Sequence, residues 1–407
     1  MASSHSMYLS ERLLRLDLRA AALVCAIVFY AFAGSPTPDM PGLIEAFIGG
    51  LLVFAIGVSG FFGALSFDRY QSYWFFAGQA FLIYGVISGL LGGLLFGADL
   101  PHVIRDLLPF GFLFLPLFLM RFYHGEVGSD RVFFLFAFIG VIFALRTDVH
   151  GLLLPFKLDS DALYYLGNSP SVLFAALFLS CCALQRLAAS FGLKNCGAAF
   201  VFLGLGVFAF LPIVETIQRA SLLAFAVYFV FAAAILFFRS PIRMSVVVVV
   251  LLCLFAVFAG GILDMMFGDF LSKTQLVGAN MRVQELEAVL VEISAHPLSF
   301  LFGKGWGASF SSPAVADIEV YFTHSLLTSV LLKTGFIGFA LCIFYIGTLF
   351  IALIREFKVQ PLIVMAIAAP LLIDVFLYAA YKSLEFGLLL ALIPYVANRS
   401  KYSDNEM

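Results

Sequence analysis

Long apolar segments constrain the fold of this chain more than any other feature, because they recur along its whole length at the size of a membrane-crossing helix. An α-helix needs roughly 20 residues to cross about 30 Å of hydrocarbon, and a backbone in lipid must satisfy its own hydrogen bonds. We count twelve such segments, which predict an all-α polytopic membrane protein with about 12 transmembrane helices in one integral membrane domain, 1–407. They lie near 18–34, 43–66, 74–97, 106–121, 131–146, 171–187, 196–214, 219–238, 244–263, 324–354, 361–381 and 384–397.

The composition supports this class of protein. Of 407 residues, 63% are hydrophobic and only 12% are charged, which is far from the balance of soluble domains. The formal net charge of −2 argues against nucleic acid as a partner, because nucleic-acid binding calls for a clustered basic face. Membrane lipid is therefore the expected environment of the chain.

The distribution of basic residues between loops predicts the orientation of the helices, because cytoplasmic loops of membrane proteins are enriched in Lys and Arg. With the N-terminus inside, fourteen of the 23 basic residues fall on one side, although the loops of the other side contain more residues. Both termini are therefore predicted to be cytoplasmic. The fourteen residues are Arg12, Arg15, Arg19, Arg69, Arg121, Arg131, Arg186, Lys194, Arg239, Arg243, Arg355, Lys358, Arg399 and Lys401.

Two outer segments are long enough to carry function. Residues 147–170 mix acidic and aromatic residues with Gly and Pro, which is typical of an ordered lid or, more often, of a connector. Residues 264–323, between the ninth and tenth spans, form too long a connection to be idle in a compact bundle. We predict that this second segment is a helical loop that carries part of the functional site.

An amphipathic helix at the membrane surface is predicted inside the second segment, because four apolar residues recur at helical spacing while charged residues occupy the other directions. His296-Pro297 should end this helix, since the residue before a proline disfavours the helical region. The three glycines of 303–307 then permit close backbone approach to another surface or a ligand, although a plain turn is the simpler interpretation. The apolar positions of the helix are Leu286, Val289, Leu290 and Ile293.

A histidine stands at the entrance of the tenth span. Residues 324–354 would reach about 45 Å as one helix, which exceeds the hydrocarbon thickness. Arg355 anchors the inner end, so His324 is predicted at or above the outer interface, within reach of a substrate at the level of the lipid headgroups. A lone histidine is more often a satisfied polar residue than a functional one, and the proximity of two outer arginines is what favours function here.

Those arginines are Arg219 and Arg282. Arg219 opens the apolar segment 219–238 at its outer end, against the usual distribution of basic residues. It can be an interfacial residue that extends its guanidinium to water, but an arginine near hydrocarbon is costly enough to need a partner. A guanidinium suits a phosphate through bidentate, charge-assisted hydrogen bonds, so the pair favours an anionic ligand.

Several motifs follow one another in a characteristic order between residues 212 and 345. They are 218–221 (Gln-Arg-Ala-Ser), Arg282, His296-Pro297 before 302–307 (Phe-Gly-Lys-Gly-Trp-Gly), and His324-Ser325 leading to 333–338 (Lys-Thr-Gly-Phe-Ile-Gly). This order resembles the O-antigen polymerase and ligase superfamily of bacterial envelope glycosyltransferases. The resemblance implies a GT-C-like helical fold in the bacterial inner membrane. It also implies metal-independent transfer of a glycan from undecaprenyl pyrophosphate at the periplasmic face.

The resemblance assigns roles to three residues, which we take as the candidate catalytic residues. Arg219 and Arg282 match the family arginines that hold the donor pyrophosphate, and His324 matches the essential histidine at the start of the long helix. Our hypothesis is that His324 orients or deprotonates the acceptor hydroxyl while the arginines stabilise the departing pyrophosphate. A single displacement of this kind would invert the anomeric carbon.

Three further residues of these stretches, Lys304, Tyr321 and Ser325, are candidate substrate-binding residues alongside the two arginines. Ser325 departs from the family pattern, which often has Asn at this position, and Lys333 stands where a glutamate is frequent. Lys333 lies nine residues after the histidine, roughly 13 Å along a helix axis, so it needs either a carboxylate partner or a wet cavity.

No metal site or cofactor is expected, because the six histidines are scattered and none is paired at ligand spacing with a cysteine or a second histidine. Asp317 and Glu319 precede His324 closely and offer carboxylates for a divalent ion. Solvated loop acids, or acids that contact the acceptor, are the more ordinary interpretation.

The acceptor is open at this stage. A polymerase would join one lipid-linked repeat unit to another, with a chain-length regulator as a possible partner, whereas a ligase would move the glycan onto lipid A core. We favour the polymerase because the Leu-Leu-Lys-Thr-Gly form of the helix resembles polymerase-like members. A secondary transporter is a third alternative, in which Lys333, Asp374 and Glu385 would carry coupling ions, but we find no internal repeat that relates the two halves.

Overall fold

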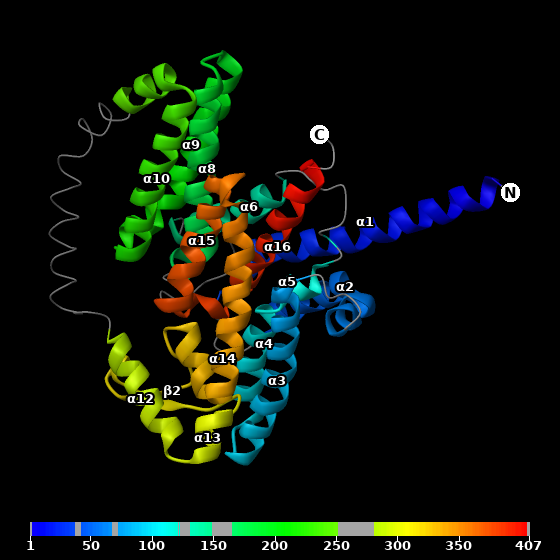
Figure 1. Ribbon diagram of the computed structural model, residues 1–407, viewed down its shortest axis with the longest axis vertical. Coiled ribbons are helices and arrows are strands. Elements are labelled where there is room, and N and C mark those ends of the chain that lie inside the picture. Colours follow the sequence, from blue (N-terminus) through cyan, green and yellow to red (C-terminus); the bar gives the residue numbers. More distant parts are fainter. Residues whose placement is uncertain are drawn as a thin grey trace.

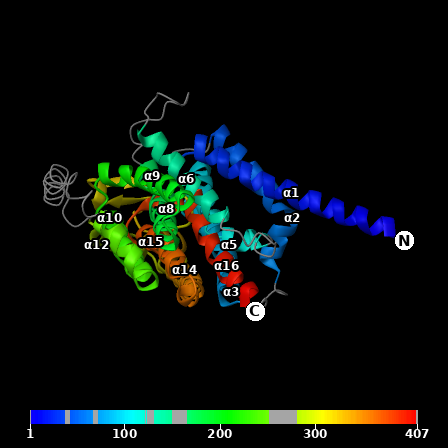
Figure 2. The ribbon, with the colours of Figure 1, turned by 90° about the horizontal axis from the view of Figure 1, so that it is seen from above.

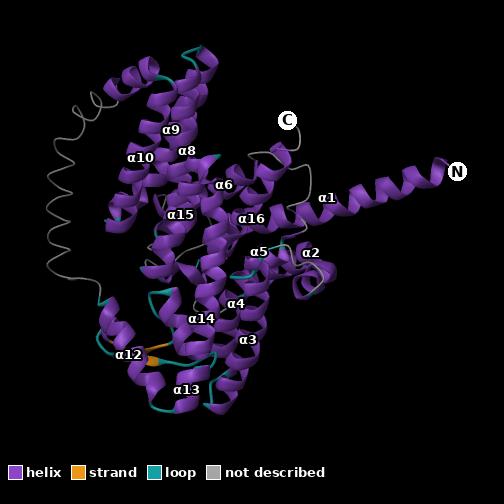
Figure 3. Ribbon diagram, in the orientation of Figure 1, coloured by secondary structure: helices purple, strands orange, loops and turns teal. Residues whose placement is uncertain are grey.

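The computed structural model describes residues 2–36, 42–66, 72–120, 122, 131–148, 165–250 and 281–404. Most of the outer segment 147–170, residues 264–280 of the second outer segment and most of the ninth predicted span lie outside these ranges. The described residues are mainly helical (Figure 1; Figure 3).

Among the described residues, one small hairpin lies between the helices. Its strands, β1 (Phe310–Ser312) and β2 (Ile318–Val320), pair antiparallel with Phe310 opposite Val320. A 3₁₀ turn, η5 (Ala379–Lys382), joins the last two helices. The helices are α1 (Ala2–Ala33), α2 (Leu43–Leu65), α3 (Tyr73–Leu95), α4 (Leu100–Phe112), α5 (Leu115–Phe118), α6 (Arg131–Asp148), α8 (Pro170–Ala189), α9 (Leu193–Glu215), α10 (Arg219–Arg239), α12 (Arg282–Ser294), α13 (Pro297–Phe302), α14 (Leu326–Arg355), α15 (Pro361–Phe376) and α16 (Leu384–Asp404).

Six helices of the described part, α2, α3, α8, α9, α10 and α14, are long and apolar enough to cross a membrane. The outward face of α10 exposes large apolar side chains. Leu223, Val230 and Phe238 are 66%, 69% and 84% exposed. A continuous apolar surface of this kind is unfavourable in water and suits lipid. The helices therefore indicate a multi-pass membrane protein, and the number of twelve spans stays a prediction.

The predicted span 106–121 is not one helix. α4 ends at Phe112, and α5 begins three residues later. Pro116 explains the interruption, because it has no backbone N–H to donate to the carbonyl of Phe112, four residues earlier, and its ring would clash with that carbonyl in a continuous helix. The break frees the carbonyl of Leu113, which accepts a hydrogen bond of 2.9 Å from the Tyr345 hydroxyl.

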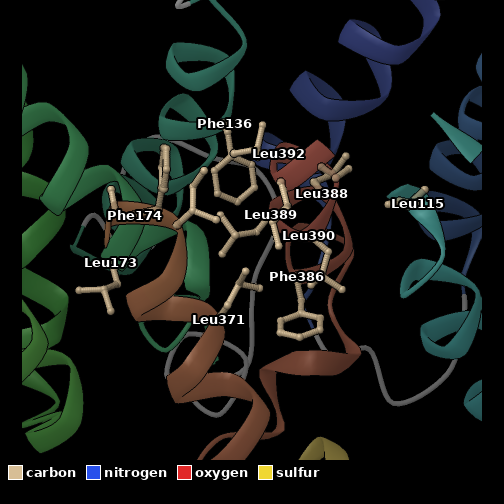
Figure 4. Close-up of a cluster of buried hydrophobic side chains, with 14 of the residues drawn as sticks. Leu115, Phe136, Leu173, Phe174, Leu371, Phe386, Leu388, Leu389, Leu390 and Leu392 are labelled. Atoms are coloured by element: carbon tan, nitrogen blue, oxygen red, sulfur yellow. The ribbon is translucent and has the colours of Figure 1, made fainter. Parts of the chain in front are cut away.

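α16 is the central helix of the bundle, and its residues from Leu384 to Val396 are all buried. Such burial suits a segment that is apolar on every side except at Glu385, which accepts a hydrogen bond from the Ser169 hydroxyl at 2.7 Å. The helix contacts α5, α8, α14 and α15, and the view from above shows it between α5 and α8 (Figure 2). Its side chains Phe386 and Leu389 pack in a cluster with Phe174 of α8 and Leu371 of α15 (Figure 4).

α12, α13 and the hairpin gather at one end of the molecule, around the first turns of α14 (Figure 1). The glycine-rich segment 303–307 fixes this arrangement, because its backbone is wedged between α3 and α14. Trp306 donates its indole N–H to the carbonyl of Gly85 on α3 at 3.0 Å. The glycines thus allow close approach to two helices, which agrees with a structural turn more than with a ligand loop.

α14 is interrupted at Gly335, which has φ +68° and ψ −168°. The interruption leaves the carbonyls of Leu332 and Lys333 free, and the backbone N–H groups of Lys304 and Gly305 donate to them, each at 2.9 Å. The long helix expected over 324–354 is therefore present but kinked, and the crossing segment restores the lost hydrogen bonds.

We expect Gly335→Ala to destabilise the protein by about 3 kcal/mol or more, because an L residue is strained at this positive φ and the new Cβ would lie 2.4 Å from the nitrogen of Gly303. The measurement is the unfolding midpoint of the purified protein in detergent. Gly347→Ala, in the same helix, is the control, because nothing lies within 4 Å of the added Cβ there. Equal stability of the two variants would show that the backbones do not cross this closely.

Candidate functional site

A buried stripe on α12 sets the geometry of the site. Glu285, Val289 and Ile293 are buried and recur every four residues, so they share the face that packs on α14 and β1. Leu286 and Leu290, which we expected on the same apolar face, are 37% and 39% exposed. The predicted amphipathic helix is present, but a carboxylate occupies one position of its buried face.

The carboxylate of Glu285 contacts both the ring and the backbone N–H of His324. The Nδ1 atom of His324 lies 3.0 Å from Oε1 of Glu285, and the backbone N–H of His324 donates to Oε2 at 3.1 Å. The hydroxyl of Ser312, at the end of β1, donates to Oε1 at 3.3 Å. The Glu285 side chain is 1% exposed and that of His324 is 25% exposed, so the carboxylate is enclosed while the imidazole reaches the surface.

The charge of Glu285 follows from these contacts. Burial raises the pKa of the carboxyl, but the hydrogen bonds from His324 and the nearby charge of Arg282 outweigh it, so the pKa is lowered overall. Glu285 is therefore ionised at neutral pH and can only accept hydrogen bonds. It follows that Nδ1 of His324 carries a hydrogen, so that Nε2 is the acceptor in the tautomer that Glu285 selects.

Arg282 is the second member of the cluster. Its guanidinium lies 3.8 Å from Oε2 of Glu285, one helical turn along α12, and donates to the carbonyl of Leu377 at 3.2 Å. Its Nε atom is buried and has no hydrogen-bond partner among the described residues. Burial lowers the pKa of Arg282 from a very high value, which leaves it cationic. The arginine thus has donor capacity left for a ligand.

Arg219 is brought to the same end of the bundle. It opens α10 and is half-buried. α10 packs on α15, and Tyr228 near the middle of α10 donates to the carbonyl of Leu362 at the start of α15. In Figure 1, α10 begins and α15 ends on the side of the bundle that faces α12, the helix that carries Arg282.

The other predicted substrate-binding residues differ in their surroundings. Ser325 precedes α14, is buried, and donates its hydroxyl to the carbonyl of Val375 at 3.1 Å, which ties α14 to α15. Tyr321 stacks its ring on His102 of α4, with ring centroids 3.9 Å apart. Lys304 forms an ion pair with Glu292. Glu292 lies ten residues after Arg282 at the start of α12, which is roughly 15 Å along the helix axis. The structure does not bring Lys304 into the cluster around His324.

Lys333 has the carboxylate partner that its depth in α14 requires. Its ammonium lies 2.5 Å from Oδ2 of Asp106 on α4 and also donates to the carbonyl of Ala308. Asp106 in turn accepts from the backbone N–H of Gly307 at 2.8 Å. The pair joins α4, the glycine-rich segment and α14, which is a structural role that the sequence did not reveal.

A cavity of about 200 Å³ is lined in part by Phe322, the neighbour of His324. The rings of Phe322 and His324 are 5.7 Å apart, and Nζ of Lys382 lies 3.9 Å from the Phe322 centroid. Many of the residues that line the cavity belong to segments predicted to lie on the outer side of the membrane. These include Gly34 and Ser35 after α1, Glu45 on α2, Arg105 on α4, Tyr165 before α8, Phe322 before α14 and Lys382 after α15.

No group of three or more His, Cys, Asp or Glu side chains that could hold a metal ion occurs among the described residues. Of the two acids considered for such a site, Glu319 accepts from the Ser309 hydroxyl at 2.5 Å, and Asp317 occupies a backbone position with φ +59°. No protein-family model matches this chain, and no curated protein matches it either.

Proposed function

We propose that the protein is a glycosyltransferase of the O-antigen polymerase and ligase type, with a twelve-span, GT-C-like helical fold in the bacterial inner membrane. It takes a glycan from undecaprenyl pyrophosphate at the periplasmic face. The observation that carries the proposal is the buried carboxylate of Glu285 on Nδ1 of His324, with Arg282 at its side. This is the arrangement that a general base and an anion-binding cation require.

Each residue then has one task in the reaction. Glu285 holds the tautomer of His324 in which Nε2 accepts the proton of the acceptor hydroxyl. The hydroxyl oxygen forms the new bond to the anomeric carbon while the bond from that carbon to the pyrophosphate oxygen breaks. The electron pair leaves with undecaprenyl pyrophosphate, and Arg282 and Arg219 stabilise its charge. The pyrophosphate needs no acid, and the proton is released from His324 to solvent.

We favour polymerisation over transfer to lipid A core. The enclosed Lys333–Asp106 pair counts against Lys333 as a coupling-ion site of the transporter alternative, because a lysine held by a carboxylate and a backbone carbonyl is poorly placed to carry an ion. The test is complementation of two strains, one without its O-antigen polymerase and one without its ligase, scored by the lipopolysaccharide ladder. Rescue only in the first supports the polymerase, and rescue only in the second makes the protein a ligase. Rescue of neither by a well-expressed protein, followed by no transfer from a purified lipid-linked donor, would remove the proposal.

The variant Arg282→Gln should lower the rate of glycan transfer about 100-fold, because it removes a cation that stabilises the leaving group. Arg355→Gln is the matched control, since Arg355 is exposed at the other end of α14 and should leave the rate unchanged. The rate is measured with membranes that contain equal amounts of each variant. A rate for Arg282→Gln within twofold of the control would mean that Arg282 does not contact the pyrophosphate.

A further inference from the structure

Two cations line the cavity beside Phe322 and lack a carboxylate within ion-pair distance among the described residues. Each cation instead lies over an aromatic ring. The guanidinium of Arg105 is 4.9 Å from the ring centroid of Tyr321, and the ammonium of Lys382 is 3.9 Å from the ring centroid of Phe322. Both residues are partly buried, and a cation with reduced access to water gains from an anionic partner, so this arrangement suits an anion.

The two acids of the same cavity do not meet this need. Asp106 is engaged by Lys333 and by the backbone N–H of Gly307. Glu45 accepts a hydrogen bond of 2.9 Å from the backbone N–H of Gly42, at the beginning of α2. The acidic side chains of the cavity therefore have local partners, whereas Arg105 and Lys382 have positive charge available for a ligand.

The rest of the lining suits a sugar. The aromatic residues Phe112, Tyr165 and Phe322 offer flat surfaces on which the C–H face of a sugar ring can pack. The volume of about 200 Å³ is below that of a drug-sized ligand site, which fits a single small group. Phe322, which lines this space, is also the ring that lies 5.7 Å from the ring of His324.

We infer that this cavity is a binding subsite for an anionic sugar, whose carboxylate or phosphate group is held by Arg105 and Lys382. The inference rests on the proposed function, and it specifies the acceptor: its terminal sugar, or the one next to it, bears a negative charge. The acceptor then approaches His324 from the side of Phe322, and the donor pyrophosphate lies on the side of Arg282.

The charge state of Lys382 predicts how binding depends on pH. Burial lowers the pKa of Lys382 to about 7; Asp106 and Glu285 act to raise it, while Lys333 and Arg105 act to lower it. The ammonium is thus present below pH 7 and is lost above it. We expect affinity for the anion to be severalfold higher at pH 6 than at pH 8.5, because the bound anion favours the charged form.

The experiment is a calorimetric titration of the purified full-length protein in nanodiscs. Glucuronate, glucose 1-phosphate and glucose are each titrated separately. We expect saturable binding of both anions and at least tenfold weaker binding of glucose. The double variant Arg105→Gln/Lys382→Gln should lose at least tenfold in affinity for the anions. Lys382→Arg should retain binding, because it keeps the charge. Arg355→Gln/Lys358→Gln is the matched control at the exposed opposite end of α14.

Three outcomes would overturn the inference: no anion binding by the wild type, equal binding of glucose, or unchanged affinity in the folded double variant. His324→Ala should bind the anions normally, which separates the two proposals. Anion binding that depends on Arg105 and Lys382, without any glycan transfer by the wild type, would leave the subsite standing and remove the proposed function. Glycan transfer by a wild type that binds neither anion would keep the proposed function and remove the subsite.

Discussion

Replacement of His324 by alanine should lower the rate of glycan transfer by about 10²–10⁴-fold, the usual contribution of a positioned general base. The loss should appear in the rate at saturating donor, because in the proposed mechanism the histidine acts on the acceptor proton and the arginines bind the pyrophosphate. The protein should still fold, since the His324 side chain is 25% exposed and its backbone N–H contact to Glu285 does not need the ring. The measurement is transfer by purified protein at several donor concentrations.

The control for this variant is His296→Asn. His296 caps α13 by accepting a hydrogen bond of 3.1 Å from the backbone N–H of Leu298, and asparagine can replace it in this role. A histidine outside the cluster should thus be dispensable. Wild-type transfer by His324→Ala would show that the imidazole is not the base.

Replacement of Glu285 by glutamine should lower transfer by about 10²-fold or more. The glutamine amide is nearly the same size but can donate to Nδ1 of His324, which would place the ring hydrogen on Nε2 and remove the acceptor that the reaction needs. It also removes the negative charge beside Arg282. The rate is measured with donor and acceptor saturating, so that binding and chemistry are distinguished.

Glu287→Gln is the matched control, because Glu287 lies on the same helix with its side chain exposed. Glu285→Asp provides a second comparison, since it keeps the charge on a shorter side chain and should retain more activity than the glutamine variant. Equal activity of Glu285→Gln and Glu287→Gln in folded protein would mean that the carboxylate does not act through His324.

The positions of the helices are largely predictable, because apolar segments separated by polar turns mark where a membrane chain can be helical. α10 (Arg219–Arg239) coincides with the predicted 219–238, and α3 (Tyr73–Leu95) with 74–97, within two residues at each end. The break between α4 and α5 was missed, since the apolar pattern continues through it and only Pro116 and its neighbours mark the interruption.

The candidate site was predictable only in part. His324 stood out at the start of a long apolar segment and Arg282 as an outer arginine on the predicted amphipathic helix, and Glu285 connects them. Glu285 was missed because surface helices carry many acids, although its spacing of four residues before Val289 places it on the buried face. Its contact with His324 joins residues 39 apart, and no local pattern specifies such a contact.

The most direct test of the account is glycan transfer by purified protein in liposomes, supplied with undecaprenyl-pyrophosphate-linked repeat units as donor and acceptor. The account predicts lengthened lipid-linked chains, one undecaprenyl pyrophosphate released for each bond formed, and loss of both products in His324→Ala and Glu285→Gln but not in Glu287→Gln. Equal transfer by the wild type and all three variants would contradict the account. The folded wild type would also contradict it if it released no undecaprenyl pyrophosphate with lipid-linked repeat units or with lipid A core as the acceptor.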